Sequence, residues 1–144
     1  MKVLIVEDDP TSISAIRDVL EIVESMSGIA IESITIARSY DDVAELDDTD
    51  FDLVLLDHNL IGDLTGEDVY NKFLRNLGIP VVGISNAENL ESGNLTQSEY
   101  LPENMCIGKL RNLDESLALL STLFQESEST VEAEVLDELA NPIR

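Results

Sequence analysis

Four short hydrophobic runs in this chain of 144 residues each end in side chains that phosphoryl chemistry can use. Those side chains are Glu7 with Asp8, then Asp57, Ser85 and Lys109. A continuous apolar run is typical of a strand that is buried on both faces, and such strands belong to parallel sheets. Because parallel strands point their carboxyl ends the same way, we expect these side chains to meet at one edge of a sheet, where ligands of open α/β sheets bind.

Carboxylates gathered in one place need a compensating cation. Mg²⁺ suits such a site, since it takes few carboxylate ligands and keeps several waters in its octahedral shell. Lys109 would add a second positive charge, and the hydroxyl of Ser85 could donate a hydrogen bond to a phosphoryl oxygen. The set of side chains therefore favours formation of an aspartyl phosphate on Asp57.

Strand-like and helix-like segments alternate along the chain, as in βαβ units. Strands are expected at residues 3–6, 29–37, 53–56, 80–84 and 105–108. Helices are expected at residues 10–24, 39–46, 65–77 and 113–124, with a short or frayed helix within 86–104. This alternation predicts an α/β fold, a doubly wound five-stranded parallel sheet of strand order 2-1-3-4-5.

The helix expected at residues 65–77 has a recognisable start. Thr65, followed three residues later by Asp68, resembles a capping box. Apolar residues at helical spacing would face the sheet: Val69, Phe73 and Leu77.

Composition narrows the class of protein. With 44% hydrophobic residues, the 15.8 kDa chain can bury a core as one domain. Its net charge of −22 would repel nucleic-acid phosphates and anionic lipid. A single cysteine suits the reducing cytoplasm, and the N-terminal apolar run is too short for a signal peptide or a membrane span.

Taken in order, the motifs resemble the receiver domain of two-component response regulators, over about residues 1 to 125. The family's acidic pair after the first strand is similar to Glu7 and Asp8. Its phosphoacceptor motif is similar to residues 55–60, which contain Asp57. The resemblance implies the flavodoxin-like receiver fold and a domain over 1–125. The acidic, serine-rich tail at 126–144 is interpreted from its own residues as a solvated linker with a short amphipathic helix, because apolar residues recur there at helical spacing.

The same resemblance implies roles for the site residues. Asp57 would be the phosphorylation site, Ser85 would move toward the phosphoryl group, and Lys109 would pair first with the acceptor and then with the phosphate.

The resemblance also implies a Mg²⁺ site. Asp8 and Asp57 would bind the ion directly, Glu7 would hold a metal-bound water, and Asn59 would offer its backbone carbonyl.

A receiver of this kind would accept its phosphoryl group from a sensor histidine kinase, a histidine phosphotransfer protein or a small acyl phosphate. It would not be an enzyme in the usual sense, since it promotes only its own phosphorylation and dephosphorylation. No effector domain is apparent after residue 125, so we expect a downstream protein to be the target, with no nucleic acid and no membrane involved.

Two departures from the family pattern leave an alternative open. Cys106 stands where the family usually has an aromatic residue, and Leu110 stands where it usually has a proline. Both would suit a pseudo-receiver, an interaction module that phosphorylation does not regulate. A phosphatase with an aspartyl nucleophile is disfavoured, because such enzymes carry a second aspartate where this chain has Asn59. His58 is interpreted as an exposed residue without a role in the site.

Overall fold

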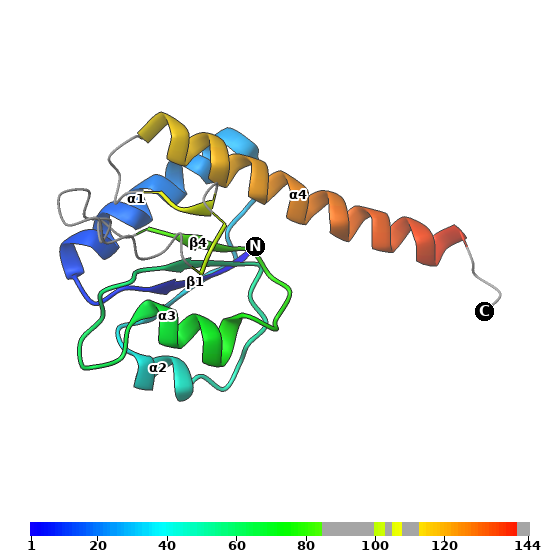
Figure 1. The fold of residues 1–144 in the computed structure, drawn as a ribbon. Coiled ribbons are helices and arrows are strands. Elements are labelled where there is room, and N and C mark those ends of the chain that lie inside the picture. Colours follow the sequence, from blue (N-terminus) through cyan, green and yellow to red (C-terminus); the bar gives the residue numbers. More distant parts are fainter. Residues whose placement is uncertain (85–99, 103–104, 108–112, 141–144) are drawn as a thin grey trace.

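The computed structural model describes residues 1–84, 100–102, 105–107 and 113–140, with residues 128–140 described by their backbone alone. The strands are β1 (Lys2–Val6), β2 (Ser33–Ala37), β3 (Leu53–Leu56) and β4 (Val81–Gly83). The helices are α1 (Pro10–Ser27), α2 (Tyr40–Ala44), α3 (Gly66–Val69), which continues as the π-helical turn η1 (Tyr70–Leu74), and α4 (Leu113–Ala140). Helices α1 and α4 cover one face of the sheet, and α2 and α3 cover the other (Figure 1).

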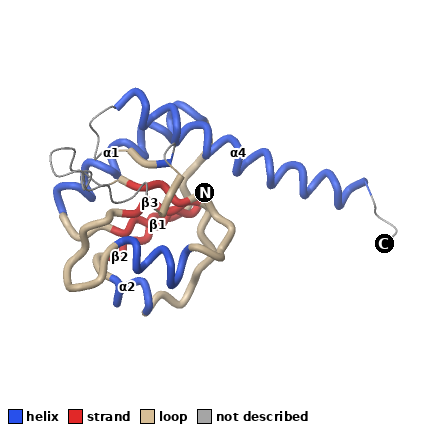
Figure 2. The backbone as a smooth tube through the Cα atoms, viewed as in Figure 1, coloured by secondary structure: helices blue, strands red, loops and turns tan. Residues whose placement is uncertain are grey.

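The described strands form one parallel sheet of order β2-β1-β3-β4 (Figure 2), which confirms this part of the predicted order. Strand β2 lies at the edge of the sheet, although it begins at Ser33 rather than at residue 29. Along it Ile34 and Ile36 alternate with Ser33 and Thr35, a pattern typical of an edge strand that is wetter on one face. At the other edge, Cys106 makes a single parallel bridge to Gly83, and the amide of Ile107 donates to the carbonyl of Gly83 at 2.7 Å. A full fifth strand therefore remains a prediction.

Both faces of the sheet are buried, which explains the continuous apolar runs. Val3 and Ile5 point toward α1 and α4, where they share one hydrophobic cluster with Leu20 and Phe124. Their neighbours along β1, Leu4 and Val6, belong to a second cluster with residues of α2, α3 and η1. Each fully buried side chain of this kind stabilises the fold by about 1.5–3 kcal/mol relative to its exposed state.

The helix after β3 begins at the predicted capping box but changes register within two turns. Thr65 and Asp68 form the box, and Val69 is fully buried as expected. The amide of Arg75 then donates to the carbonyl of Tyr70 at 2.8 Å, an i to i+5 bond that makes η1 a π turn.

A π turn holds more residues than an α turn. The next side chain after Val69 that faces the sheet is therefore Leu74, five residues later, and its exposed fraction is 2%. Phe73 is only partly buried, and Leu77 is 38% exposed. The prediction that Leu77 faces the sheet was therefore wrong.

Helix α4 is longer than predicted. It was expected to end near Phe124, and it continues to Ala140, beyond the body of the domain (Figure 1). Residues 113–140 contain neither glycine nor proline, and Pro142 is the first residue that would break the helix. The boundary predicted at residue 125 remains a prediction. Within the described residues, no helix combines the length and apolarity needed to cross a bilayer.

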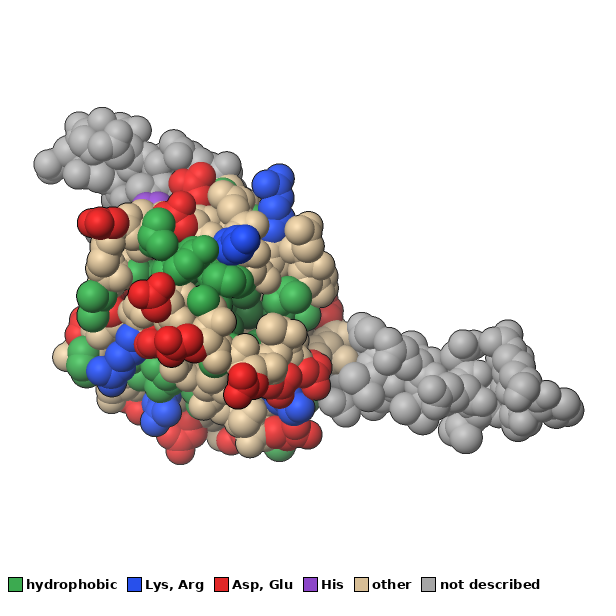
Figure 3. All heavy atoms as spheres, turned by 90° about the horizontal axis from the view of Figure 1, so that it is seen from below, with side chains coloured by type: hydrophobic (Ala, Val, Ile, Leu, Met, Phe, Trp, Pro, Cys, Tyr) green, Lys and Arg blue, Asp and Glu red, His purple; other side chains and the backbone are tan. Residues whose placement is uncertain are grey.

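The side of the molecule formed by α2 and α3 carries exposed hydrophobic side chains among acidic ones (Figure 3). Ile61 and Leu64, in the loop between β3 and α3, are 64% and 41% exposed.

Candidate metal centre at the carboxyl ends of the strands

The ends of β1 and β3 lie side by side. Val6 is paired with Leu56 in the parallel register, and the amide of Asp57 donates to the carbonyl of Val6 at 2.9 Å. On the other side of β1, the amide of Glu7 donates to the carbonyl of Ala37 at 3.0 Å. Glu7 and Asp57, which directly follow β1 and β3, therefore lie at the same edge of the sheet.

Three carboxylates meet there. Glu7, Asp8 and Asp57 each have an oxygen within 4.8 Å of the other two. Glu7 is completely buried, Asp57 is 1% exposed and Asp8 is half-buried. Three carboxylates so close together, two of them buried, favour the binding of a compensating cation. A donor set of carboxylate oxygens, open to solvent on the Asp8 side, fits a hard divalent ion such as Mg²⁺.

Backbone amides of the following loops donate hydrogen bonds to two of these carboxylates. Oε1 of Glu7 accepts from the amide of Asp9 at 3.2 Å, and Oδ1 of Asp57 accepts from the amide of Asn59 at 3.4 Å. Each carboxylate is thereby tied to the loop that follows it. The side chain of Asn59 is exposed, and the role predicted for its backbone carbonyl as a metal ligand remains a prediction.

Gly66, the first residue of α3, is a close neighbour of Asp57. Its amide donates to the carbonyl of His58 at 2.7 Å. A Cβ at this position would collide with the carbonyl oxygen of Asp57 and would lie 2.9 Å from the Cα of His58. The first residue of α3 therefore packs directly on the backbone of the residue predicted as phosphoacceptor. The sequence did contain a signal for this close contact. Glycine is a poor helix former, so its presence directly after the capping Thr65 indicates a position without room for a side chain.

His58 was interpreted as an exposed residue without a role in the site; the exposure was wrong, and the absence of a role remains a prediction. It is half-buried, and its Nδ1 lies 3.1 Å from Oη of Tyr100, with the donor set by the histidine tautomer. The rings of Tyr100 and Tyr70 also contact each other. Tyr100 gave no signal in the sequence, because it lies 42 residues from His58 in the weakly patterned stretch before the expected fifth strand.

Ser85 and Lys109 lie outside the described residues. The described chain reaches Ile84, whose amide donates to the carbonyl of Leu56 at 3.0 Å, and Ile107, which is bonded to Gly83. Leu110 and the stretch expected to contain the fourth helix, up to residue 99, are likewise outside the described part.

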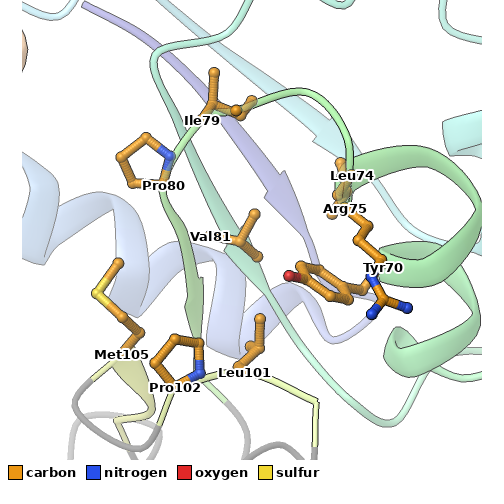
Figure 4. Close-up of a pocket in the computed structure, with 10 residues that line it drawn as sticks. Tyr70, Leu74, Arg75, Ile79, Pro80, Val81, Leu101, Pro102 and Met105 are labelled. Carbon is orange, nitrogen blue, oxygen red and sulfur yellow. The ribbon is translucent and has the colours of Figure 1, made fainter.

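A cavity of about 210 Å³ lies at the other end of the sheet (Figure 4). Pro80 and Val81, at the start of β4, line it together with Tyr70, Leu101 and Met105. It is mainly apolar and is not part of the acidic cluster.

Comparison with family models and with curated proteins gave no match. Solved structures do match. The response regulator PhyR from Brucella abortus is 30% identical, with a TM-score of 0.63 over 92% of this chain and 51% of that one. The anti-anti-sigma factor PhyR from Bartonella quintana is 25% identical, with a TM-score of 0.64 over 92% of this chain and 51% of that one. A CheY-like receiver domain from Methanospirillum hungatei is 21% identical, with a TM-score of 0.64 over 90% of this chain and 97% of that one.

The chain has the fold of a response-regulator receiver domain. It spans about half the length of the PhyR chains and nearly the whole of the CheY-like domain. The three proteins compared are named as a response regulator, an anti-anti-sigma factor and a CheY-like response regulator receiver domain protein. In the receiver fold an acidic pocket usually binds metal, and this chain carries an acidic cluster of Glu7, Asp8 and Asp57.

Proposed function

We propose that this receiver fold is a phosphoacceptor of a two-component system or phosphorelay, with Asp57 as the residue that is phosphorylated. The observation that carries the proposal is the cluster of Glu7, Asp8 and Asp57, whose carboxylate oxygens lie within 4.8 Å of one another at the carboxyl ends of β1 and β3. A cluster of carboxylates, two of them buried, costs stability unless it holds a cation, so a ligand-binding role accounts for it better than a structural one.

In the proposed reaction, a carboxylate oxygen of Asp57 attacks the phosphorus of the donor. A P–O bond forms to Asp57 while the bond from phosphorus to the leaving nitrogen or acyl oxygen breaks, and the leaving group keeps that electron pair. When bound by Asp8, Asp57 and the carbonyl of Asn59, with Glu7 acting through a water, Mg²⁺ would neutralise charge on the phosphoryl oxygens.

The protein's own groups have separate tasks in this proposal. The bond from the amide of Asn59 holds Oδ1 of Asp57, and the contact with Gly66 holds its backbone, so the carboxylate is oriented before the donor arrives. By their resemblance to the family pattern, Lys109 would pair with the phosphate and Ser85 would donate to a phosphoryl oxygen.

The proposed donor is a phosphohistidine on a sensor kinase or on a phosphotransfer protein, and the proposed output is a change in a protein–protein surface. Figure 3 shows one such surface, the α2–α3 side, where hydrophobic side chains are exposed. Ile61 and Leu64 are exposed beside the first residues of α2. The net charge of −22 supports a protein target rather than a nucleic acid. A cytoplasmic location is part of the same proposal.

The test is phosphorylation by acetyl phosphate in the presence of Mg²⁺, followed by intact-protein mass spectrometry. The wild type should gain one phosphoryl group, EDTA should abolish the gain, and Asp57→Asn should gain none. Asp63→Asn is the matched control, since Asp63 is an exposed aspartate in the loop that follows β3 and should label like the wild type. Equal labelling of Asp57→Asn and the wild type would refute the assignment.

A pseudo-receiver is the second candidate. It is favoured by Cys106, which replaces the family's aromatic residue with a half-buried thiol whose Sγ lies 3.5 Å from the carbonyl oxygen of Pro102. A Mg²⁺ titration followed by amide chemical shifts separates the two candidates. Shifts at Asp8 and Asp57 at millimolar Mg²⁺ would support the phosphoacceptor, and their absence would support the pseudo-receiver.

A further inference from the structure

The outer side of β2 carries backbone groups that point away from the sheet. The amide of Glu7 donates to the carbonyl of Ala37, so Ala37 turns its own amide and carbonyl toward β1. Successive residues of a strand turn these groups to opposite sides. Ile34 and Ile36 therefore present their amides and carbonyls at the outer side of β2, and among the described strands only β1 pairs with β2.

The sequence of this edge does little to prevent pairing with another chain. Residues 29–37 contain four isoleucines and a single charged residue, Glu32, and they contain no lysine, proline or glycine. Edge strands of native proteins usually prevent such pairing with charged side chains, with proline or with a bulge. An edge rich in isoleucine is instead a template on which an extended segment can form a further strand.

A groove of about 470 Å³ lies beside this edge, where β2 meets α1. Its lining comes from three residues of α1 at helical spacing, Arg17, Glu21 and Glu24, and from residues 31–34. The side chains of Ile31 and Ile34 are half-buried and pack against the hydrophobic cluster on the α1 side of the sheet. The groove therefore combines apolar side chains on the strand with charged side chains on the helix.

The charge of the groove is unevenly distributed. A carboxylate oxygen of Glu24 accepts from the amide of Ile31, which places this end of α1 beside the residues just before β2. Glu21 lies one turn earlier in the helix and Glu32 lies on the strand side, and neither forms a salt bridge with a described residue. Arg17 lies two turns before Glu24, about 10 Å along the helix axis. Three carboxylates thus gather near the start of β2, and the guanidinium lies toward its other end.

We propose that this groove and the outer side of β2 bind an extended, basic segment of a partner protein as an added strand. The amides and carbonyls of Ile34 and Ile36 would bond to the backbone of the segment. Lysine or arginine side chains at alternate positions would lay their aliphatic stems on Ile31 and Ile34 and place their cationic ends among the three carboxylates.

Charge selects this occupant over a second copy of the chain. A second copy would bring the same negative groove, and the same net charge of −22, against this one. A basic segment meets the opposite charge, both in the groove and over the whole molecule. The proposal does not depend on phosphorylation of Asp57, so each can fail without the other.

The probe is a seven-residue peptide of alternating lysine and valine, acetylated and amidated at its ends, titrated into the full chain and followed by amide NMR. At saturation, the amides of Ile34 and Ile36 should shift and should exchange with solvent at least about tenfold more slowly. The amides of Thr35 and Ala37, which face β1, should change little. The same peptide methylated on its backbone amides cannot donate to the strand and should bind about tenfold more weakly or not at all.

Charge reversal tests the role of the groove. Glu21→Lys combined with Glu32→Lys should weaken binding of the peptide about tenfold, because each exposed ion pair contributes about two- to fivefold. Glu45→Lys combined with Asp63→Lys is the matched control, since it changes the net charge equally at exposed positions on the α2–α3 side. The control should bind the peptide within about twofold of the wild type.

Three results would overturn the proposal. One is the absence of binding at millimolar peptide. Another is binding that leaves exchange at Ile34 and Ile36 unchanged, or that weakens equally in the two double variants, because attraction to the net charge would then explain it. The third is slower exchange at these two amides without peptide, together with a dimer in sedimentation equilibrium, which would assign the edge to a second copy.

Discussion

Gly66→Ala is the substitution whose effect the structure predicts most directly. The added Cβ would collide with the carbonyl oxygen of Asp57 and would lie 2.9 Å from the Cα of His58 and 3.0 Å from the carbonyl carbon of Asp57. All three atoms belong to the backbone, so no side chain can rotate out of the way. The start of α3 and the end of β3 must move apart.

The size of the effect follows from two opposing terms. Overpacking of a well-filled site costs about 1–3 kcal/mol. Alanine in place of glycine in a helix returns up to about 1 kcal/mol, and less in the first turn. The free energy of unfolding should therefore fall by about 1–2 kcal/mol, which lowers the melting temperature by about 3–8 °C for a chain of this length.

The same movement should slow phosphorylation, because it displaces the backbone that carries the Asp57 carboxylate. A displacement of this kind should reduce the labelling rate by about tenfold or more. Thermal unfolding followed by circular dichroism measures the first effect, and the acetyl phosphate assay measures the second.

Gly78→Ala is the matched control. Gly78 has a φ of 73° and no atom within 4 Å of an added Cβ. Alanine at this position should lower the free energy of unfolding by about 1–2 kcal/mol, because its Cβ disfavours the left-handed backbone conformation. The labelling rate should stay unchanged. A Gly66→Ala variant that melts and labels like the wild type, or a Gly78→Ala variant that labels as slowly as Gly66→Ala, would refute the reasoning.

Three further predictions concern packing, metal and charge. In urea denaturation, Leu74→Ala should lower the free energy of unfolding by about 2–5 kcal/mol, and Leu77→Ala by no more than about 1 kcal/mol. The reason is that the π turn buries Leu74 and exposes Leu77, so equal losses would argue against the π register. Mg²⁺ at ten to a hundred times its dissociation constant should stabilise the wild type by about 1–3 kcal/mol in thermal unfolding and should have little effect on Asp8→Asn; equal stabilisation of both proteins would exclude Asp8 as a ligand. Raising NaCl from 0.1 to 1 M should raise the melting temperature, because the Debye length falls from about 10 to about 3 Å and screens the net charge of −22; a lower melting temperature would contradict self-repulsion as a limit on stability.

The sheet and the acidic cluster were predictable because both depend on features that are local in the sequence. A run such as residues 3–6 is apolar throughout only if both of its faces are covered, and this indicates a parallel sheet. Glu7, Asp8 and Asp57 follow such runs directly, so the order of the strands brings them together. The confirmed part of the strand order follows from the edge-like alternation of β2.

Errors arose where a segment departs from ideal periodicity. The spacing of Val69, Phe73 and Leu77 fits an α-helix, and nothing in these residue types indicates the i to i+5 bond at Tyr70 that moves Leu74 to the buried face. The length of α4 was underestimated for a different reason. The acidic, serine-rich composition after Glu126 suggested a linker, whereas the absence of glycine and proline was the better guide.

By itself, then, the sequence determined which strands lie in the interior of the sheet and which carboxylates directly follow those strands. Both follow from the pattern of hydrophobic residues and from residue types, which can be read from neighbouring positions in the chain. Only the tertiary structure decided that Gly66 abuts the backbone of Asp57 and that Tyr100 reaches His58. Such contacts join residues far apart in the chain through the exact placement of loops, and a local pattern carries no information about that placement.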